Sequence, residues 1–280
     1  MRTISEETID SFVCRKIQDG VYCILDADED SFYLVEGESC AAVIDTGITR
    51  DVRIMPLLRE LTDKPVILIL THAHIDHVHH MDEFETVYLC HDELTMPEAF
   101  LHEHKAGKNL DFYSTVHMDT GTLIDLGCRV LEICKIPGHT PGSVAIYDAK
   151  ADLVFTGDAI GSGAGVWMQL PGCKSLEEYE KSLRFFLKWL IDRGGTMKFW
   201  GGHSEQFSIS RQVPGYNPLS MGLLADLIDL VHQVRTGSLV GEVTELSPHL
   251  RMREARYAAY GRAEMLYNPD NLSIYDETNC

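Results

Sequence analysis

The first half of the chain is patterned as short apolar runs separated by acidic or glycine-containing turns. Three such runs, Val21–Leu25, Phe32–Glu36 and Cys40–Asp45, follow one another closely, and this spacing predicts an antiparallel meander. The run Pro65–Leu70 is apolar on both faces, as expected of a buried strand. A short helix is predicted near Pro56–Leu61, because proline suits the first turn of a helix better than its interior.

The second half again shows short strands followed by a helix. Four apolar runs predict strands at Leu123–Leu126, Arg129–Lys135, Ser143–Tyr147 and Leu153–Phe155. The clearest helical pattern covers Leu176–Arg193. Ser175 and Glu178 form a capping box before it, and Gly194 ends it. A short strand, Lys198–Trp200, is predicted to follow.

Strands, a helix and a strand thus occur twice in the same order. This order predicts two similar αβ halves that pack sheet against sheet with their helices outside. We expect one domain over residues 1–280, because no linker-like segment divides the chain. Residues from about 215 to 280 are expected to form a C-terminal tail, with a helix near Leu219–Val234 and an extended stretch near Tyr257–Tyr267.

Composition and charge narrow the class of protein. The 280 residues are 45% hydrophobic and 24% charged, which is ordinary for a globular protein. No apolar run approaches the roughly 18 residues that cross a bilayer, and the N-terminus lacks the core of a secretion signal, so we expect a cytoplasmic protein. A net charge of −19 disfavours nucleic acid and anionic membranes as partners and favours a small-molecule substrate. The eight cysteines form no CxxC pair and are expected to be reduced core thiols.

Four side chains of the kind that bind metals follow the buried run Pro65–Leu70. They are His72, His74, Asp76 and His77. An irregular loop at a strand end can turn all of them towards one point, whereas a regular strand cannot. Imidazole and carboxylate are ligands of Zn²⁺, so the cluster predicts a metal site rather than a solvated His-rich loop.

Three later residues share this setting, because each is a ligand-type side chain near the end of an apolar strand, beside glycines that allow tight turns. They are His139, Asp158 and His203. Alone, each is consistent with an ordinary turn residue, and an aspartate after Thr-Gly is commonly a helix N-cap. Together with the first cluster they make seven ligands, which is the complement of two metal ions.

These motifs resemble, in the same order, those of the metallo-β-lactamase superfamily. They are DTG at 45–47, THAHIDH at 71–77, PGHTPGS at 137–143, FTGD at 155–158 and GH at 202–203. The resemblance covers about residues 20–205. It implies the α/β (α+β) fold of that family, a four-layer αββα sandwich with the metals at one edge, and this agrees with the layout predicted from the apolar runs.

The resemblance also implies a role for each matching residue. The implied ligands are His72, His74 and His139 for the first metal, Asp76, His77 and His203 for the second, and Asp158 as the bridge between them. An aspartate at the bridging position, with no cysteine ligand, is similar to the glyoxalase II and lactonase branches rather than to the β-lactamases. Two divalent ions are implied, with Zn²⁺ favoured and Fe or Mn left open. Asp45 would orient the histidine ligands from behind, or would be a plain turn aspartate.

Such a site implies a hydrolase that uses a hydroxide bridging the metals to cleave an ester, a thioester or a lactone. Asp158 is the candidate acceptor of the hydroxide's proton, and Asp76 is the second residue expected to be catalytic. A phosphodiesterase is an alternative, disfavoured by the absence of a Lys/Arg cluster near the motifs. A mono-iron oxidoreductase similar to the persulfide dioxygenases is another. A non-catalytic binding module is disfavoured because no ligand is missing.

The sequence departs from the family directly after the first motif. The family commonly has a pair of glycines there, whereas this chain has His79 and His80. An extra ligand or a proton relay is one interpretation. We favour the other, in which two polar side chains face outwards at the start of a helix.

Substrate contacts are expected from loops that surround the metals. The candidates are Phe112, Tyr113, His117, Trp167, Met168 and Tyr216. An apolar wall with few cations suits a neutral or hydrophobic acyl group, although aromatic loop residues are also often part of the core. The tail after about residue 215 either covers the pocket or makes a dimer contact, so a homodimer is left open.

Overall fold

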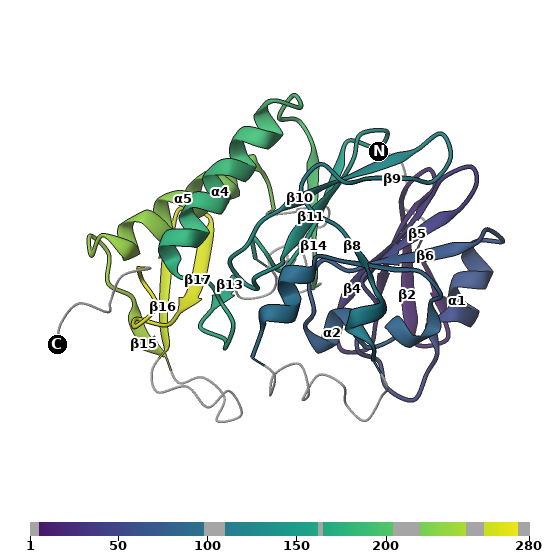
Figure 1. Ribbon diagram of the computed structural model, residues 1–280, viewed down its shortest axis with the longest axis horizontal. Coiled ribbons are helices and arrows are strands. Elements are labelled where there is room, and N and C mark those ends of the chain that lie inside the picture. The colour runs from purple at the N-terminus through teal and green to yellow at the C-terminus, as the bar shows by residue number, and fades with distance from the viewer. Residues whose placement is uncertain (1–5, 98–109, 162–164, 204–218, 245–254, 274–280) are drawn as a thin grey trace.

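The computed structural model describes residues 6–97, 110–161, 165–203, 219–244 and 255–273. Two large sheets lie against each other in the middle of the molecule, and helices cover their outer faces (Figure 1). A smaller third sheet, formed mainly by the C-terminal part of the chain, lies beside α4 and α5 (Figure 1).

The first sheet has eight strands in chain order. They are β1 (Glu6–Ile9), β2 (Phe12–Gln18), β3 (Val21–Leu25), β4 (Ser31–Glu36), β5 (Ala41–Ile44), β6 (Val66–Ile69), β7 (Val87–Leu89) and β8 (Val116–His117). The antiparallel pairing of β3, β4 and β5 confirms the predicted meander. From β5 to β8 the pairing is parallel, so these strands end at the same edge of the sheet.

The second sheet has the order β14-β12-β11-β10-β9. Its strands are β9 (Leu123–Asp125), β10 (Val130–Lys135), β11 (Val144–Asp148), β12 (Leu153–Gly157) and β14 (Lys198–Gly201). All five were predicted to within a few residues. β12 and β14 are parallel, so the residues that follow them emerge side by side.

The third sheet was not predicted as a sheet. It joins β13 (Val166–Met168) to β15 (Glu242–Thr244), β16 (Ala255–Tyr260) and β17 (Ala263–Tyr267), in the order β13-β17-β16-β15. The predicted extended stretch near Tyr257–Tyr267 is a hairpin, and its second strand pairs in parallel with β13. The predicted tail helix is α5 (Met221–Arg235). Strand β13 therefore links the tail to the middle of the chain.

Three hydrophobic clusters define the layers of the sandwich. One lies between the two large sheets and includes Ile44 of β5 and Ile133 of β10. A second packs α1 (Ile54–Leu61) against the outer face of the first sheet. The third packs α4 (Leu176–Ile191) and α5 against the second sheet and the hairpin. The order helix, sheet, sheet, helix confirms the αββα fold.

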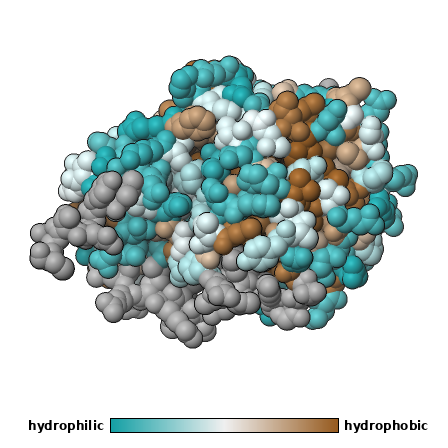
Figure 2. Space-filling view, in the orientation of Figure 1, coloured by the Kyte–Doolittle hydropathy of each residue, from teal (hydrophilic) through white to brown (hydrophobic). Residues whose placement is uncertain are grey.

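The shorter helices lie in the connections that join β6, β7 and β8. They are α2 (Ile75–Val78) and the 3-10 helices η1 (Met81–Glu83), η2 (His91–Thr95) and η3 (Phe112–Ser114). No helix in the described part of the chain is long and apolar enough to cross a membrane. Hydrophilic residues predominate on the face drawn in Figure 2, as the net charge of −19 leads one to expect.

Helix α1 is capped by a side chain from another element. Arg53, its N-cap residue, makes no side-chain capping hydrogen bond. Glu83 of η1 accepts the backbone N–H groups of Ile54 at 3.1 Å and Met55 at 3.0 Å instead. A carboxylate at this position satisfies free N–H groups and favours the positive end of the helix dipole.

We expect Glu83→Gln to lower the unfolding free energy at neutral pH by about 1–2 kcal/mol, since it removes the charge and one acceptor of a buried cap. Burial raises the pKa of Glu83, but the hydrogen bonds from His80, Met55 and Ile54 more than offset this and lower it. The contribution of Glu83 is therefore complete above the ordinary glutamate pKa of 4.5 and is lost as the pH falls through the depressed value.

Urea unfolding of the metal-free protein between about pH 6 and about pH 3.5 checks this prediction, because the two proteins should converge in stability towards the acid end. A difference that does not change with pH would contradict it.

Candidate metal centre

The loop between β6 and α2 carries the first four predicted ligands. Two lie in the irregular stretch and two in the first turn of α2, in the order His72, His74, Asp76 and His77. Asp45, which follows the parallel strand β5, reaches this loop. Its Oδ1 accepts the Thr71 N–H at 2.8 Å and its Oδ2 accepts the Thr71 hydroxyl at 2.7 Å. Asp45 thus fixes the start of the ligand loop.

The second sheet supplies the other three predicted ligands. His139 lies in the loop between β10 and β11, Asp158 follows β12, and His203 follows β14. Tyr179 of α4 donates a hydrogen bond to the carbonyl oxygen of Ala159 at 2.6 Å, which fixes the chain next to Asp158. The ends of separate strands therefore bring together side chains that are far apart in sequence.

The seven side chains gather into two groups. In each group, the candidate ligand atoms lie within 4.8 Å of one another. The first group is His72, His74 and His139, and the second is Asp76, His77, Asp158 and His203. The resemblance implied a similar division with Asp158 as a bridge, whereas the distances group Asp158 with Asp76, His77 and His203.

The carboxylate of Asp158 faces both groups. Its Oδ2 lies 3.7 Å from Nε2 of His139 and 3.3 Å from Nε2 of His203, while its Oδ1 lies 3.5 Å from Nε2 of His77. Asp76 lies within the second group, with its Oδ2 3.3 Å from Nε2 of His203. Asp158 is thus the residue placed to contact a cation in either group.

Hydrogen bonds behind the imidazoles fix which nitrogen faces the centre. Nδ1 of His77 donates to Oδ2 of Asp45 at 2.9 Å, and Nδ1 of His203 donates to Oδ1 of Asp30 at 2.7 Å. In both rings, Nε2 is left to face the carboxylates of the second group. A carboxylate behind a histidine in this way sets the tautomer that binds a metal.

Strand β13 performs the same task for the first group. The main-chain carbonyl of Trp167 accepts a hydrogen bond from Nδ1 of His139 at 2.7 Å. Trp167 is paired with Leu266 of β17, so the C-terminal hairpin supports the strand that orients this histidine.

Burial and charge set the protonation of the histidines. Burial lowers the pKa of His72 well below its ordinary value, and it also lowers the pKa of His139. Both rings are then neutral near pH 7, which is the form that binds metals. For His203, burial lowers the pKa, but Asp158 and Asp30 more than offset this and raise it well above its ordinary value. A metal ion would displace this proton.

The residues present fit a metal ion. Nε2 of His72 is buried and has no hydrogen-bond partner among the described residues. Buried polar atoms are normally paired, so this nitrogen is placed to bind an ion. Imidazole nitrogens with carboxylate oxygens are a donor set that Zn²⁺ and similar ions accept, and none of the grouped residues is a cysteine.

The predicted substrate residues are scattered. Phe112 and Met168 are 3% and 1% exposed and belong to the hydrophobic clusters, which fits core packing better than substrate contact. Tyr113 is exposed, and His117 accepts a hydrogen bond from the His91 N–H at its Nδ1. Trp167 is 39% exposed, and its carbonyl contacts a predicted ligand. Tyr216 lies outside the described residues.

His79 and His80 do not face outwards, so that prediction was wrong. They are 6% and 1% exposed. Nε2 of His80 donates to the carbonyl oxygen of Thr49, and its Nδ1 lies 3.0 Å from Oε1 of Glu83. His80 therefore ties η1 to a neighbouring loop. Neither histidine belongs to the two ligand groups.

Two buried carboxylates at the site were missed. Asp30 holds His203 from behind, and Glu93 of η2 accepts the Ala73 N–H at 2.8 Å. Asp30 stands in an acidic turn with two other aspartates and a glutamate nearby, and nothing in the sequence distinguishes it. Both contacts depend on long-range folding, so local patterns carry no signal for them.

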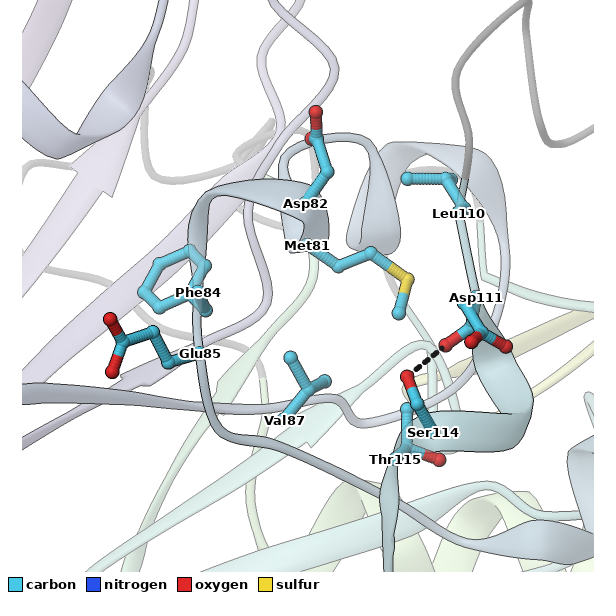
Figure 3. A pocket seen from close by; sticks show the side chains of 9 residues that line it. All are labelled: Met81, Asp82, Phe84, Glu85, Val87, Leu110, Asp111, Ser114 and Thr115. Atoms are coloured by element: carbon cyan, nitrogen blue, oxygen red, sulfur yellow. Dashed lines mark hydrogen bonds between the residues drawn. The ribbon is translucent and has the colours of Figure 1, made fainter.

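A separate cavity of about 210 Å³ lies near η1 and η3 (Figure 3). Its lining consists of Met81, Asp82, Phe84, Glu85, Val87, Leu110, Asp111, Ser114 and Thr115. Met81 and Val87 point into it, whereas the carboxylates of Asp82 and Glu85 point away (Figure 3). It contains none of the grouped candidate ligands.

The fold and the two His/Asp groups define an αββα protein built to bind metal. The family model of the metallo-beta-lactamase superfamily matches residues 26–195. The chain therefore belongs to the metallo-beta-lactamase superfamily, a family of metallo-hydrolases whose members bind metal ions. The match ends before His203, which the structure places with the other candidate ligands.

Named relatives include two hydrolases. The chain is 26% identical to the acyl-coenzyme A thioesterase MBLAC2 of Homo sapiens over 236 residues, which cover 70% of this chain and 82% of that one. It is 27% identical to the hydroxyacylglutathione hydrolase of Synechococcus sp. (strain JA-2-3B'a(2-13)), covering 75% and 79%. The solved metallo-beta-lactamase from Pontibacter korlensis has a TM-score of 0.53 at 16% identity, covering 82% and 99%, which supports the fold alone.

Proposed function

We propose that the protein is a dinuclear metal-dependent hydrolase that cleaves a thioester, an ester or a lactone of a small molecule. The position of Asp158 carries this proposal, because one carboxylate faces two groups of donors. A carboxylate between two such groups supports two ions rather than one. The names of the relatives favour a thioester among the three substrates.

The proposed ligands follow the two groups. They are His72, His74 and His139 for one ion, Asp76, His77 and His203 for the other, and Asp158 for both. We favour Zn²⁺, which suits nitrogen and carboxylate donors. When bound, two divalent ions would lower the pKa of a bound water molecule and polarise the substrate carbonyl.

Asp158 would transfer a proton from the attacking water to the leaving group. Burial raises the pKa of Asp158, but His203 and His77 more than offset this and hold it well below its ordinary value. An ionised carboxylate can accept the proton of the attacking water at Oδ2. The same proton would then pass to the leaving sulfur or oxygen as its bond to the acyl carbon breaks.

We propose a small substrate and a cytoplasmic location for the protein. The protein's net charge of −19 repels polyanions, and the half-exposed Trp167 offers an apolar contact beside His139. The cysteines at described positions are all free, as expected of reduced thiols. These observations favour a neutral or hydrophobic acyl group.

Turnover by metal-reconstituted protein on matched thioesters, aryl esters, lactones and phosphodiesters tests the proposal. One acyl group should be presented both as its coenzyme A thioester and as its uncharged N-acetylcysteamine thioester, since only the former carries phosphates. We expect carbonyl substrates to be cleaved, with thioesters fastest. Asp76→Ala should lose on the order of 10²–10³-fold in kcat/KM, because a metal ligand is removed.

Asp226→Asn is the control. Asp226 belongs to α5 and accepts a hydrogen bond from the backbone N–H of Arg262, which lies in the turn between the strands of the hairpin. Asp226 lies outside both ligand groups. Its activity should stay within a few-fold of wild type. Phosphodiester cleavage with inert carbonyl substrates would overturn the acyl-hydrolase proposal. One bound iron with oxygen uptake would replace it with the oxidoreductase alternative.

A further inference from the structure

Glu93 is a buried carboxylate behind the first ligand group. It belongs to η2, and its side chain is 0% exposed. Its Oε2 accepts the Ala73 N–H at 2.8 Å, and its Oε1 accepts the Thr140 hydroxyl at 2.6 Å and the Gly142 N–H at 2.5 Å. One carboxylate therefore holds two loops that come from different sheets.

These contacts lie next to the ligands of that group. Ala73 is the residue between His72 and His74, and Thr140 directly follows His139. The three histidines of the first group are thus carried by two loops that share one hydrogen-bonding partner. The distance of 2.9 Å between Nε2 of His139 and Nδ1 of His74 shows how closely the loops bring the rings together.

The loop around His139 is shaped for this carboxylate. A Cβ atom on Gly142 would lie 2.8 Å from both Cγ and the backbone nitrogen of Glu93, so glycine permits the close approach. The Thr140 hydroxyl also lies 2.6 Å from the Ser143 hydroxyl, which can donate to it while Thr140 donates to Glu93. All three groups facing the carboxylate are then donors, and an ionised carboxylate, which has no proton of its own, accepts from all of them.

Burial of a carboxylate is costly, and the three hydrogen bonds offset this cost only in part. Burial raises the pKa of Glu93 to about 7, although the hydrogen bonds from Thr140, Ala73 and Gly142 lower it. Buried ionisable groups of this kind concentrate at functional sites. Divalent ions in front of the carboxylate would favour its charged form.

We propose that Glu93 is a positioning residue that joins the two loops and so assembles the first metal-binding group, His72, His74 and His139. This inference rests on the proposed metal-dependent function. Glu93 contacts neither the metal nor the substrate. It acts by holding the backbone at Ala73 and Gly142.

Glu93→Gln separates this role from packing, because the side chain keeps its shape but one carboxylate oxygen becomes an NH₂ group. In either orientation of the amide, that group faces a backbone N–H, at Ala73 or at Gly142. We expect the affinity for one of two bound Zn²⁺ ions to fall about 10–100-fold, as for other residues behind metal ligands, while the other ion binds as in wild type. Competition with a chromophoric chelator measures both affinities.

A second variant keeps the test decisive if Glu93→Gln folds poorly. Thr140→Val removes one donor to the carboxylate with little change in volume, and we expect a smaller loss at the same site, about 3–10-fold. Hydrogen exchange of the Ala73 amide in the metal-free protein should be faster in Glu93→Gln. The absorption spectrum of the Co²⁺-substituted protein should change in only one of its two components.

Glu83→Gln is the matched control, since Glu83 is also a buried glutamate that accepts two backbone N–H groups. It should lose stability and keep both metal affinities. Equal Zn²⁺ affinities in wild type, Glu93→Gln and Thr140→Val would overturn the role of Glu93 and leave the proposed function intact. Failure of the wild type to bind two ions would instead overturn the proposed function.

Discussion

Asp158→Asn is expected to lose on the order of 10³-fold or more in turnover and to bind at most one metal ion tightly. The reason is the position of the carboxylate, whose oxygens lie 3.3–3.7 Å from imidazole nitrogens of both groups. Asparagine offers one acceptor and one NH₂ group, so it cannot face cations on both sides. It also lacks the charge that two ions require and cannot take a proton at neutral pH.

The metal content after dialysis and the pH dependence of kcat/KM together measure this effect. A variant that loses one ion but keeps its turnover would show that Asp158 binds metal without transferring the proton. Asp226→Asn, the same substitution between α5 and the hairpin, should keep two ions and near-normal turnover. An Asp158→Asn variant with two ions and wild-type turnover would contradict both roles of Asp158.

Much of the fold could be predicted because the apolar runs are short, distinct and separated by clear turns. The strands of the second sheet and helix α4 were all predicted, and the Ser175–Glu178 capping box is present. By contrast, β1 and β2 carry charged residues along their length, so no apolar run marked them. The pairing of Val166–Met168 with β17 joins segments about a hundred residues apart, and no local pattern can reveal it.

Prediction of the site from the sequence was limited in the same way. The candidate ligands were visible because they stand near the ends of buried strands and match family motifs. The groups that hold them were not, because Asp30 and Glu93 act through contacts with distant residues, His203 and Ala73. The prediction that His80 faces outwards was wrong for a related reason. Its burial depends on contacts with Thr49 and Glu83, which only the fold brings close to it. The sequence indicates which side chains can bind a metal, whereas the fold decides what orients them.

Gly202→Ala is expected to reduce metal affinity and to lower turnover by on the order of 10²-fold, because displacement of reacting groups by about 1 Å has effects of this size. A Cβ atom on Gly202 would lie 2.3 Å from Oδ1 of Asp158 and 2.6 Å from Cε1 of His77. The backbone cannot retreat easily, since the Gly202 N–H donates to the Gly157 carbonyl at 3.1 Å and the Gly202 carbonyl accepts the Ser31 N–H at 2.7 Å. The two side chains must therefore move.

The effect should fall on the site rather than on the fold. Gly202 does not have the positive φ that alanine resists, so the methyl group adds contact strain without backbone strain. Gly222→Ala is the matched control: its Cβ would meet the end of the flexible Arg262 side chain, which can swing away. We expect both variants to unfold cooperatively in urea, but only Gly202→Ala to lose metal. Two tightly bound ions and wild-type kcat/KM in Gly202→Ala would show that Asp158 and His77 are not the groups that hold the metals, because a ligand pair displaced by a methyl group cannot keep its affinity.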